Sequence, residues 1–255
     1  SEDISSFLAH LKVQSGLSRV SQQNKLSALR TFYRFLKKRE LVSSNPAQEV
    51  GSIKTEKKLP TFLTFSEIDR LLSFLKKRYF ENKCFLNARN WAIFELFYAS
   101  GLRVSEMASL KRENIDLHNR LVRVYGKGKR ERIVPFNESA RQALQEYETF
   151  RELFEDVEGY FFVNRRGRRL SARGIRKVFE RVLREAGIFE KKISPHTLRH
   201  TFATHFLAGG GELRLVQEML GHASLSTTQI YTHIDWERMR KVYDLTHPHS
   251  GRREN

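Results

Sequence analysis

The chain of 255 residues has little cysteine and no long apolar run. Its single cysteine, Cys84, permits no internal disulfide and excludes a zinc site built on several cysteines. The longest apolar run, around residues 91–99, is interrupted by Glu95 and is too short to span a bilayer. Residues 1–3 show neither the basic nor the apolar region of a signal peptide. These absences predict a protein of the reducing cytoplasm.

Acidic residues are also few: 29 Asp and Glu stand against 46 Lys and Arg, which gives a net charge of +17. Solubility alone does not require this excess. It therefore indicates a polyanionic partner, nucleic acid first and an anionic membrane surface second. A hydrophobic fraction of 40% with 11% aromatic residues excludes a wholly disordered chain.

Composition divides the chain into two predicted domains. Residues 1–54 form a small helical domain, whose main helix is expected to stop at Ser43-Ser44-Asn45-Pro46. Residues 55–60 form a polar, basic linker, and residues 61–255 form a larger domain. Alternating residues at 115–135, around a glycine-rich basic turn, predict a small antiparallel sheet in an otherwise helical domain. The predicted fold class is mostly α with a small antiparallel β-sheet.

A predicted helix at 171–186 has one apolar face and one basic face, which is interrupted only by Glu180. A solvated surface is the ordinary explanation of such a face, but solvated faces usually mix charge signs. In a chain this basic, the pattern favours contacts with phosphate groups. The predicted DNA-binding residues are those of this face together with two at the turn of the sheet: Arg173, Arg176, Lys177, Arg181, Arg184, Lys129 and Arg130.

Two segments early in the larger domain contain candidate site residues. Arg103 follows Gly101, which is placed to end a helix, and Glu106 lies three residues further on and can hold the Arg103 guanidinium. An arginine and a glutamate at this spacing more often form an ordinary ion pair at the surface than part of a functional site. Lys127, between two glycines at the hairpin tip, can contact a phosphate or donate a proton, and a solvated turn lysine fits the local sequence equally well.

A third segment starts a helix at Ser194-Pro195 and places His196 and Arg199 in its first turn. The amino end of a helix favours anions, so these residues suit a phosphate. His196 and His200 have the spacing of a metal-binding pair, but the glutamate of the metalloprotease pattern is absent. We therefore predict no metal and no cofactor.

A fourth segment contains His222, directly after Gly221, and Tyr231. Taken alone, they are typical of a helix cap and of a core residue. Taken with the two arginines, the lysine and His196, they fit a phosphodiester exchange. Arginines can neutralise the phosphate, a tyrosine hydroxyl can attack it, and lysine or histidine can move the protons, without ATP or metal.

The order of these residues and the residues around them resemble the tyrosine recombinase (phage-integrase) family. The similarity is greatest to the Xer branch, which resolves chromosome dimers in bacteria and archaea. It extends over nearly the whole chain, and its most specific segments are Gly101–Glu106, Gly126–Gly128, His196–His205, Val216–His222 and Ser226–His233.

The resemblance implies a set of phosphate-binding residues. Arg103 and Arg199 would bind the scissile phosphate, and Glu106 would support Arg103. His222 would hydrogen-bond a non-bridging oxygen. All of these positions carry the residue that the family pattern requires.

The resemblance also implies how the strand is cut and rejoined. Tyr231 would attack and become linked to the 3′-phosphate, and Lys127 would protonate the leaving 5′-oxygen. His196 would assist proton transfer and hold the phosphate. Strand exchange would then pass through a Holliday junction, in the resolution of chromosome or plasmid dimers during chromosome partition and cell division.

The resemblance further implies a two-domain, C-shaped clamp on double-stranded DNA, with four protomers on two specific sites. The tetramer would contain one kind of chain or a second Xer-type recombinase as well, with a DNA translocase as a candidate activator and no membrane partner. Family members usually have one more helix before the helix expected at residues 4–14. The amphipathic C-terminal helix would dock on a neighbouring protomer or on its own domain.

Three other functions stay open at this point. A phage or mobile-element integrase shares the chemistry but often carries an additional arm-binding domain. A type IB topoisomerase-like enzyme shares the cleavage step and relaxes supercoils as a monomer. A non-catalytic DNA-binding protein would bind sites without cutting them.

Overall fold

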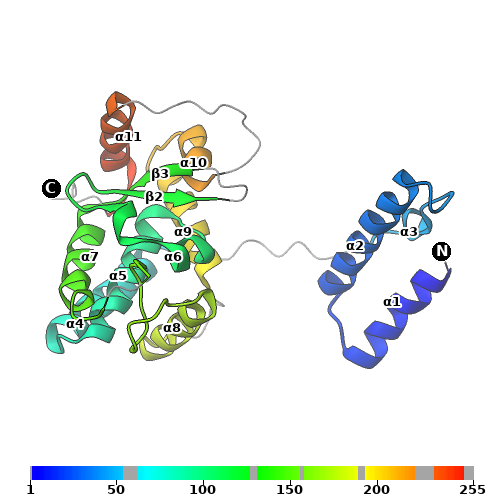
Figure 1. Cartoon of the computed structure of the whole chain (residues 1–255), viewed down its shortest axis with the longest axis horizontal. Coiled ribbons are helices and arrows are strands. Elements are labelled where there is room, and N and C mark those ends of the chain that lie inside the picture. The colour runs from blue at the N-terminus through cyan, green and yellow to red at the C-terminus, as the bar shows by residue number, and fades with distance from the viewer. Residues whose placement is uncertain are drawn as a thin grey trace. The chain divides into compact units, whose positions relative to one another are not determined.

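The computed structural model describes residues 2–53, 62–126, 131–155, 158–188, 193–221 and 233–249, with the backbone alone for 233–238. Within them the chain is mostly helical and has one three-stranded antiparallel sheet (Figure 1), which confirms the predicted fold class. It forms two compact units, residues 1–59 and 60–255. The predicted linker, 55–60, lies outside the described residues. None of the described helices is both long and apolar enough to cross a membrane.

The smaller unit consists of three helices around a compact apolar core. Arg30 ties the second helix to the third, because its Nε donates to the carbonyl oxygen of Ala47 at 3.0 Å and its Nη2 to that of Val50 at 2.6 Å. Buried Ile4, Leu8 and Leu26 pack with Ala47. The helices are α1 (Glu2–Ser15), α2 (Arg19–Lys38) and α3 (Pro46–Glu49).

The predicted stop of the long helix at residues 43–46 is wrong. The helix α2 ends at Lys38, and Asn45-Pro46 begins α3 instead. The side chain of Asn45 accepts a hydrogen bond from the backbone N–H of Ala47, and Pro46 occupies the first helical turn, where its missing N–H costs nothing. Asn45-Pro46, which the sequence pattern predicts to end a helix, therefore begins the helix α3.

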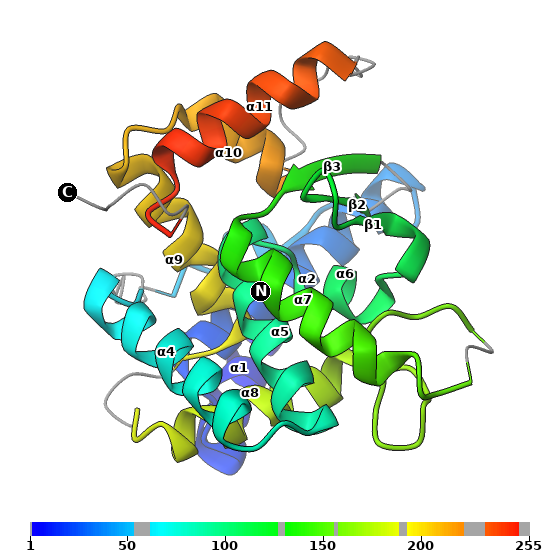
Figure 2. The same ribbon diagram turned by 90° about the vertical axis from the view of Figure 1, so that its left-hand side faces the viewer.

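The larger unit is built around α5, a helix whose side chains are buried on all sides from Asn87 to Ser100. Figures 1 and 2 show α5 running through the middle of the unit, with α4, α7 and α9 against it. A helix buried all round loses the amphipathic pattern of a surface helix. The bounds of these four helices are Phe65–Glu81 for α4, Phe85–Ser100 for α5, Glu138–Arg151 for α7 and Pro195–Ala208 for α9.

The sheet has the order β1-β2-β3, and every pair is antiparallel. Val122 and Val124 face the core, while Arg123 and Tyr125 between and after them are exposed, as alternation along a strand requires. The tip of the β2–β3 hairpin, residues 127–130, lies outside the described residues. The strands are β1 (Ile115–Asp116), β2 (Leu121–Tyr125) and β3 (Glu131–Pro135).

The remaining described elements of the larger unit are further helices, of which α8 and the C-terminal α11 are the longest. They are α6 (Val104–Ser109), the 3-10 helix η1 (Arg112–Asn114), α8 (Ala172–Glu185), α10 (Leu213–Leu220) and α11 (His233–Thr246). The structure places α11 on its own unit. The hydroxyl of the buried Tyr243 donates to the carbonyl oxygen of Ala99 at 2.7 Å, and Arg120 forms two hydrogen bonds with Asp244, at 3.1 and 2.6 Å.

A carboxylic acid, Glu95, is buried in the middle of α5. Its Oε1 accepts a hydrogen bond from Nε1 of Trp91 at 3.0 Å. Its Oε2 has no hydrogen-bond partner among the residues that the structure describes. Burial in these surroundings raises the pKa of Glu95 from 4.5 to about 7, because the apolar interior disfavours the charged form.

We expect Glu95→Gln to change how stability depends on pH. The raised pKa means that the folded wild type loses stability as pH rises from 4.5 through 7, where the buried group must lose its proton. The amide of the variant does not titrate and avoids this loss. The unfolding free energy of the variant should therefore gain about 2.5 kcal/mol on the wild type between pH 5 and pH 8.

Urea unfolding followed by tryptophan fluorescence, at several pH values, measures this difference. Glu81→Gln, in which the lost carboxylate is exposed, is the control. Parallel profiles for Glu95→Gln and the wild type would contradict the assignment.

Candidate active site

The site begins where two helices end. Both α5 and α10 stop at a glycine in the left-handed region, Gly101 with φ 59° and Gly221 with φ 65°. A side chain at Gly101 would also meet Phe202, because an added Cβ would lie 2.5 Å from a ring carbon of that residue. These positions require glycine, and they leave carbonyl oxygens at both helix ends without partners inside the helix.

Arg199 joins the two helix ends. It lies in the first turns of α9, which starts at Ser194 as N-cap and Pro195, as predicted. Its Nη1 donates to the carbonyl oxygen of Gly101 at 2.5 Å, and its Nη2 donates to that of Leu220 at 2.6 Å. Carbonyl groups at the C-terminus of a helix attract a cation, so they stabilise this guanidinium in a site where the residue is only 9% exposed.

Burial lowers the pKa of Arg199 from 12.5 to about 10, and repulsion from Arg103 lowers it further in the same direction. The group therefore stays cationic at neutral pH. A guanidinium has five N–H donors, of which the two carbonyl groups engage two. Among the residues that the structure describes, Arg199 thus retains N–H donors for an anion.

Arg103 and Glu106 form the ion pair that their spacing predicts. Nη1 of Arg103 lies 2.9 Å from Oε1 of Glu106, and the backbone N–H of Arg103 donates to Oε2 at 2.7 Å. The other end of the guanidinium donates to the carbonyl oxygen of Gly221 at 3.2 Å. The Glu106 side chain is 3% exposed and that of Arg103 is 41% exposed, so the carboxylate is buried beneath a guanidinium that faces solvent.

A second arginine, Arg132 of β3, holds the same carboxylate. Its Nη1 and Nη2 each donate to one oxygen of Glu106 at 2.8 Å. Hydrogen bonds from Arg132 and Arg103 keep the pKa of Glu106 below its usual range, although burial acts to raise it. Two guanidinium groups, those of Arg103 and Arg132, thus hold one carboxylate, and the Arg199 guanidinium lies near enough to Arg103 to be repelled by it. This excess of positive charge suits an anion such as a phosphodiester.

His196 lies in the first turn of α9, is exposed, and precedes Arg199 by one turn. The ring of His200 contacts that of Phe62, with centroids 6.4 Å apart. No group of three His, Cys, Asp or Glu side chains suited to a metal is found within the described ranges.

The structure therefore pairs Arg103 with Glu106, and it holds Arg199 at the neighbouring ends of α5 and α10 through backbone carbonyl oxygens. It adds Arg132, which the sequence analysis did not single out, because an arginine beside a basic turn has the pattern of a solvated one. The other predicted site residues, Lys127, Lys129, Arg130, His222 and Tyr231, lie outside the described residues.

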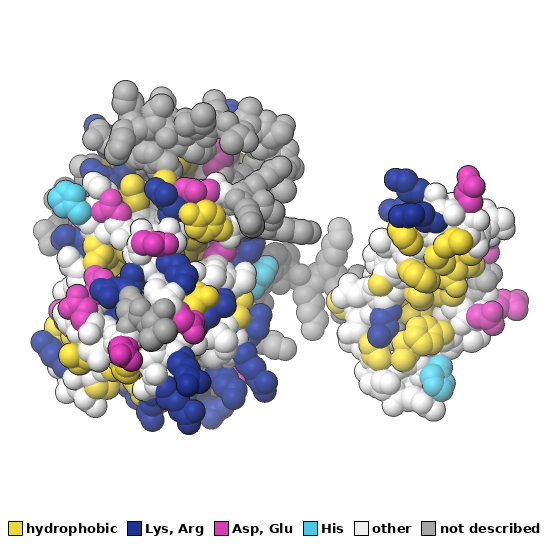
Figure 3. Space-filling model, in the orientation of Figure 1, with side chains coloured by type: hydrophobic (Ala, Val, Ile, Leu, Met, Phe, Trp, Pro, Cys, Tyr) yellow, Lys and Arg dark blue, Asp and Glu magenta, His cyan; other side chains and the backbone are white. Residues whose placement is uncertain are grey.

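The predicted basic face is present on α8. Ile175, Val178, Phe179 and Val182 are buried, and the five Arg and Lys residues of the opposite face are all exposed. Figure 3 shows Lys and Arg side chains gathered at the lower edge of the larger unit, where Figure 1 places α8.

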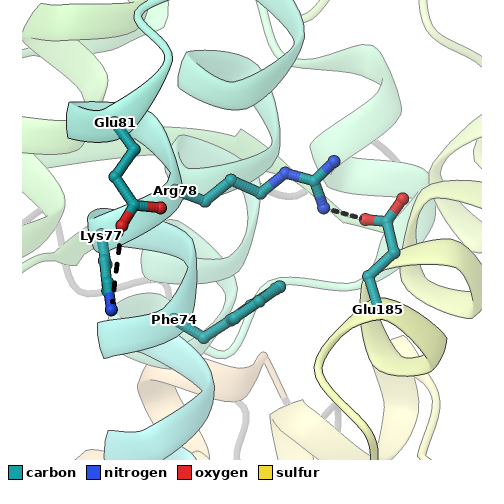
Figure 4. A pocket seen from close by; sticks show the side chains of 5 residues that line it. All are labelled: Phe74, Lys77, Arg78, Glu81 and Glu185. Atoms are coloured by element: carbon teal, nitrogen blue, oxygen red, sulfur yellow. Dashed lines mark hydrogen bonds and ion pairs between the residues drawn. The ribbon is translucent and has the colours of Figure 1, made fainter.

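The end of α8 also contacts α4. Arg78 of α4 donates to Glu185 of α8 across a shallow hollow that Phe74 lines, and Lys77 pairs with Glu81 at 3.8 Å (Figure 4). These charges neutralise each other in pairs. Arg78 of α4 thus neutralises the charge of Glu185, and the exposed face of α8 has a net positive charge.

A helical unit with Arg103 facing solvent, Arg132 and Arg199 close behind it and a basic face on α8 has the charge that the chemistry of a phosphodiester requires. Residues 61–238 match the model of the phage integrase family, and residues 1–40 match that of the phage integrase N-terminal SAM-like domain. The chain belongs to the phage integrase family and is a tyrosine recombinase, as the resemblance of its motifs predicts.

Xer recombinases are among the relatives of the chain. It is 44% identical over 243 residues to the tyrosine recombinase XerC of Thermodesulfovibrio yellowstonii, covering 93% of this chain and 79% of that protein. It is 43% identical over 250 residues to XerD of Oceanobacillus iheyensis, with coverages of 96% and 82%. The structure of the XerH recombinase bound to a palindromic difH substrate, a post-cleavage complex, matches with a TM-score of 0.72, 29% identity and coverages of 94% and 71%.

We expect Glu106→Gln to destabilise the larger unit. The amide cannot balance the guanidiniums of Arg103 and Arg132, and removing one partner of a buried ion pair costs about 3 kcal/mol. Urea unfolding measures the loss. Glu131→Gln is the matched control, because Glu131 pairs with Arg123 at 3.2 Å on the exposed side of the hairpin, where an ion pair contributes at most about 1 kcal/mol. Equal losses in the two variants would contradict the structural role of Glu106.

Proposed function

We propose that this recombinase binds double-stranded DNA at a specific site and exchanges strands by the Xer reaction, in the resolution of chromosome or plasmid dimers. The arginine cluster around Glu106 supports this most directly. It offers a fixed positive site on the larger unit, of the kind that holds a phosphate while charge grows on its oxygens. The DNA-bound structure of the related XerH recombinase supports the choice of duplex DNA as the ligand.

In the proposed reaction Arg103 and Arg199 bind the non-bridging oxygens of the scissile phosphate. The Tyr231 hydroxyl attacks phosphorus, a Tyr–O–P bond forms to the 3′-phosphate, and the bond to the 5′-oxygen breaks. Lys127 supplies the proton that the 5′-oxygen takes up, and His196 assists the loss of the tyrosine proton. The phosphodiester energy is kept in the new bond, so the rejoining step needs no ATP.

In the same proposal His222 hydrogen-bonds a non-bridging oxygen of the scissile phosphate. The proposal also includes the arrangement of the two domains on the DNA. The smaller unit, residues 1–54 in our prediction, and the larger one, residues 61–255, would close on the duplex as a C-shaped clamp. Four protomers, of one kind or with a second Xer-type recombinase, would assemble on two sites. A DNA translocase is the proposed activator, and the proposed location is the cytoplasm.

Covalent trapping tests the proposal. The protein is incubated with a nicked duplex that carries a candidate recombination site, with EDTA present and no ATP, and is then run on a denaturing gel. We expect a slowly migrating protein–DNA band for the wild type and none for Tyr231→Phe. The exposed tyrosine of β2 provides the matched control, and Tyr125→Phe should retain the band.

The outcomes separate the mechanisms. Loss of the band in both tyrosine variants would contradict Tyr231 as the specific nucleophile. A band that requires added metal would contradict the metal-free chemistry. DNA binding without any band, on every candidate site, would favour the non-catalytic DNA-binding function.

We also expect the affinity for DNA to fall steeply with salt, because each phosphate contact releases a counterion. Replacing Arg176 and Arg181 of α8 by alanine should reduce the slope of log K against log[salt] by about 1 for each residue. Fluorescence anisotropy with a labelled duplex measures the slope. Arg141→Ala is the control, since Arg141 lies on α7 and pairs with Glu138 at 2.5 Å. An unchanged slope in the α8 variant would exclude its basic face from the DNA contact.

A further inference from the structure

Arg132 of β3 is placed unlike Arg123 of the neighbouring strand β2. Its side chain is 11% exposed, whereas that of Arg123 on β2 is 51% exposed. Arg123 pairs at the surface with Glu131, and Arg132 points inward to Glu106. A buried guanidinium is costly unless its donors are engaged, so this burial needs the particular partners that Arg132 has.

Those partners belong to two other elements. Nη1 and Nη2 of Arg132 hold both oxygens of Glu106 in α6, at 2.8 Å each. Its Nε donates to the carbonyl oxygen of Met219, near the end of α10, at 2.7 Å. An added Cβ at Gly221 would lie 3.3 Å from the Arg132 side chain, so the end of α10 packs closely on this guanidinium. One side chain therefore fixes β3, α6 and α10 relative to one another.

The two-point contact also fixes the direction of the carboxylate. With Arg132 on both oxygens, Oε1 of Glu106 faces Nη1 of Arg103 and Oε2 faces the backbone N–H of the same residue. Beyond this carboxylate, the Arg103 guanidinium donates to the carbonyl oxygen of Gly221, at the end of the same α10 that Arg132 holds. Both contacts of Arg103 thus depend on groups that Arg132 positions.

We propose that Arg132 is a positioning residue for the reaction: through Glu106 and the end of α10 it holds Arg103 in the orientation that receives the scissile phosphate. The inference rests on the proposed function, in which Arg103 binds that phosphate. Arg132 itself does not need to touch the DNA.

The test measures two quantities for each variant: the rate of covalent complex formation on the nicked duplex, and the affinity for the same duplex. Arg132→Met should slow the covalent step about 100-fold, as expected for a displaced catalytic group, and leave affinity nearly unchanged. Arg132→Lys keeps the charge but cannot hold both oxygens, and it should be slowed to an intermediate extent. Arg123→Met, the matched control on the neighbouring strand, should react like the wild type.

Two further readouts separate positioning from a loss of fold. When Arg132→Met is combined with Glu106→Gln, it should reduce the rate little further than Glu106→Gln alone. Both substitutions break the same series of contacts, from Arg132 through Glu106 to Arg103. In Arg132→Met, the acidic limb of the rate profile should move to higher pH. Of the charged groups that the structure describes around Glu106, Arg103 and the more distant Arg199 then remain, and burial favours the protonated form of Glu106.

The outcomes are distinct. A wild type that binds DNA but forms no covalent complex overturns the proposed function and this inference with it. A wild type that reacts, with Arg132→Met as fast as Arg123→Met, overturns this inference alone. This inference is also overturned if two results occur together: the rate losses of Arg132→Met and Glu106→Gln multiply in the double variant, and the pH profile of Arg132→Met is unchanged. Those results would mean that Arg132→Met causes a general loss of structure.

Discussion

The geometry of the site depends on one buried carboxylate. Glu106 receives hydrogen bonds from Arg132 on one side and from both the guanidinium and the backbone of Arg103 on the other. A buried negative charge is costly in itself, and these four contacts compensate for it. Because each contact has a fixed direction, the same compensation also sets the orientation of the exposed arginine. Stability and the alignment of the site therefore have a common origin here.

The second support comes from helix ends. Gly101 and Gly221 end α5 and α10 in the left-handed conformation, and the carbonyl oxygens there accept from Arg199 and Arg103. The rigidity of this arrangement comes from α5, which is buried on all sides and cannot shift without disturbing the core of the larger unit. The apolar core thus fixes the positions of the helix ends, and through them the positions of the Arg199 and Arg103 guanidinium groups.

Local signals in the sequence predicted the parts of this site that depend on nearby residues. The spacing of Arg103 and Glu106 indicated their ion pair, Ser194-Pro195 indicated the start of α9, and alternation indicated the hairpin. Such local signals do not predict contacts between residues that lie far apart in the sequence. The burial of Arg132 follows from a pairing with Glu106, 26 residues away, and from the carbonyl of Met219, 87 residues away. The wrong stop at residues 43–46 shows the same limit, because a proline after an N-cap residue can also begin a helix.

The charge balance of the cluster connects its structure to its ligand. Two guanidinium groups share the Glu106 carboxylate, and a third, that of Arg199, lies close by; after burial, repulsion from Arg103 contributes to the lowered pKa of Arg199. In the absence of an anion, part of this repulsion acts against the folded state. A phosphodiester placed among the arginines removes it, so any anion that the site binds must also stabilise the larger unit.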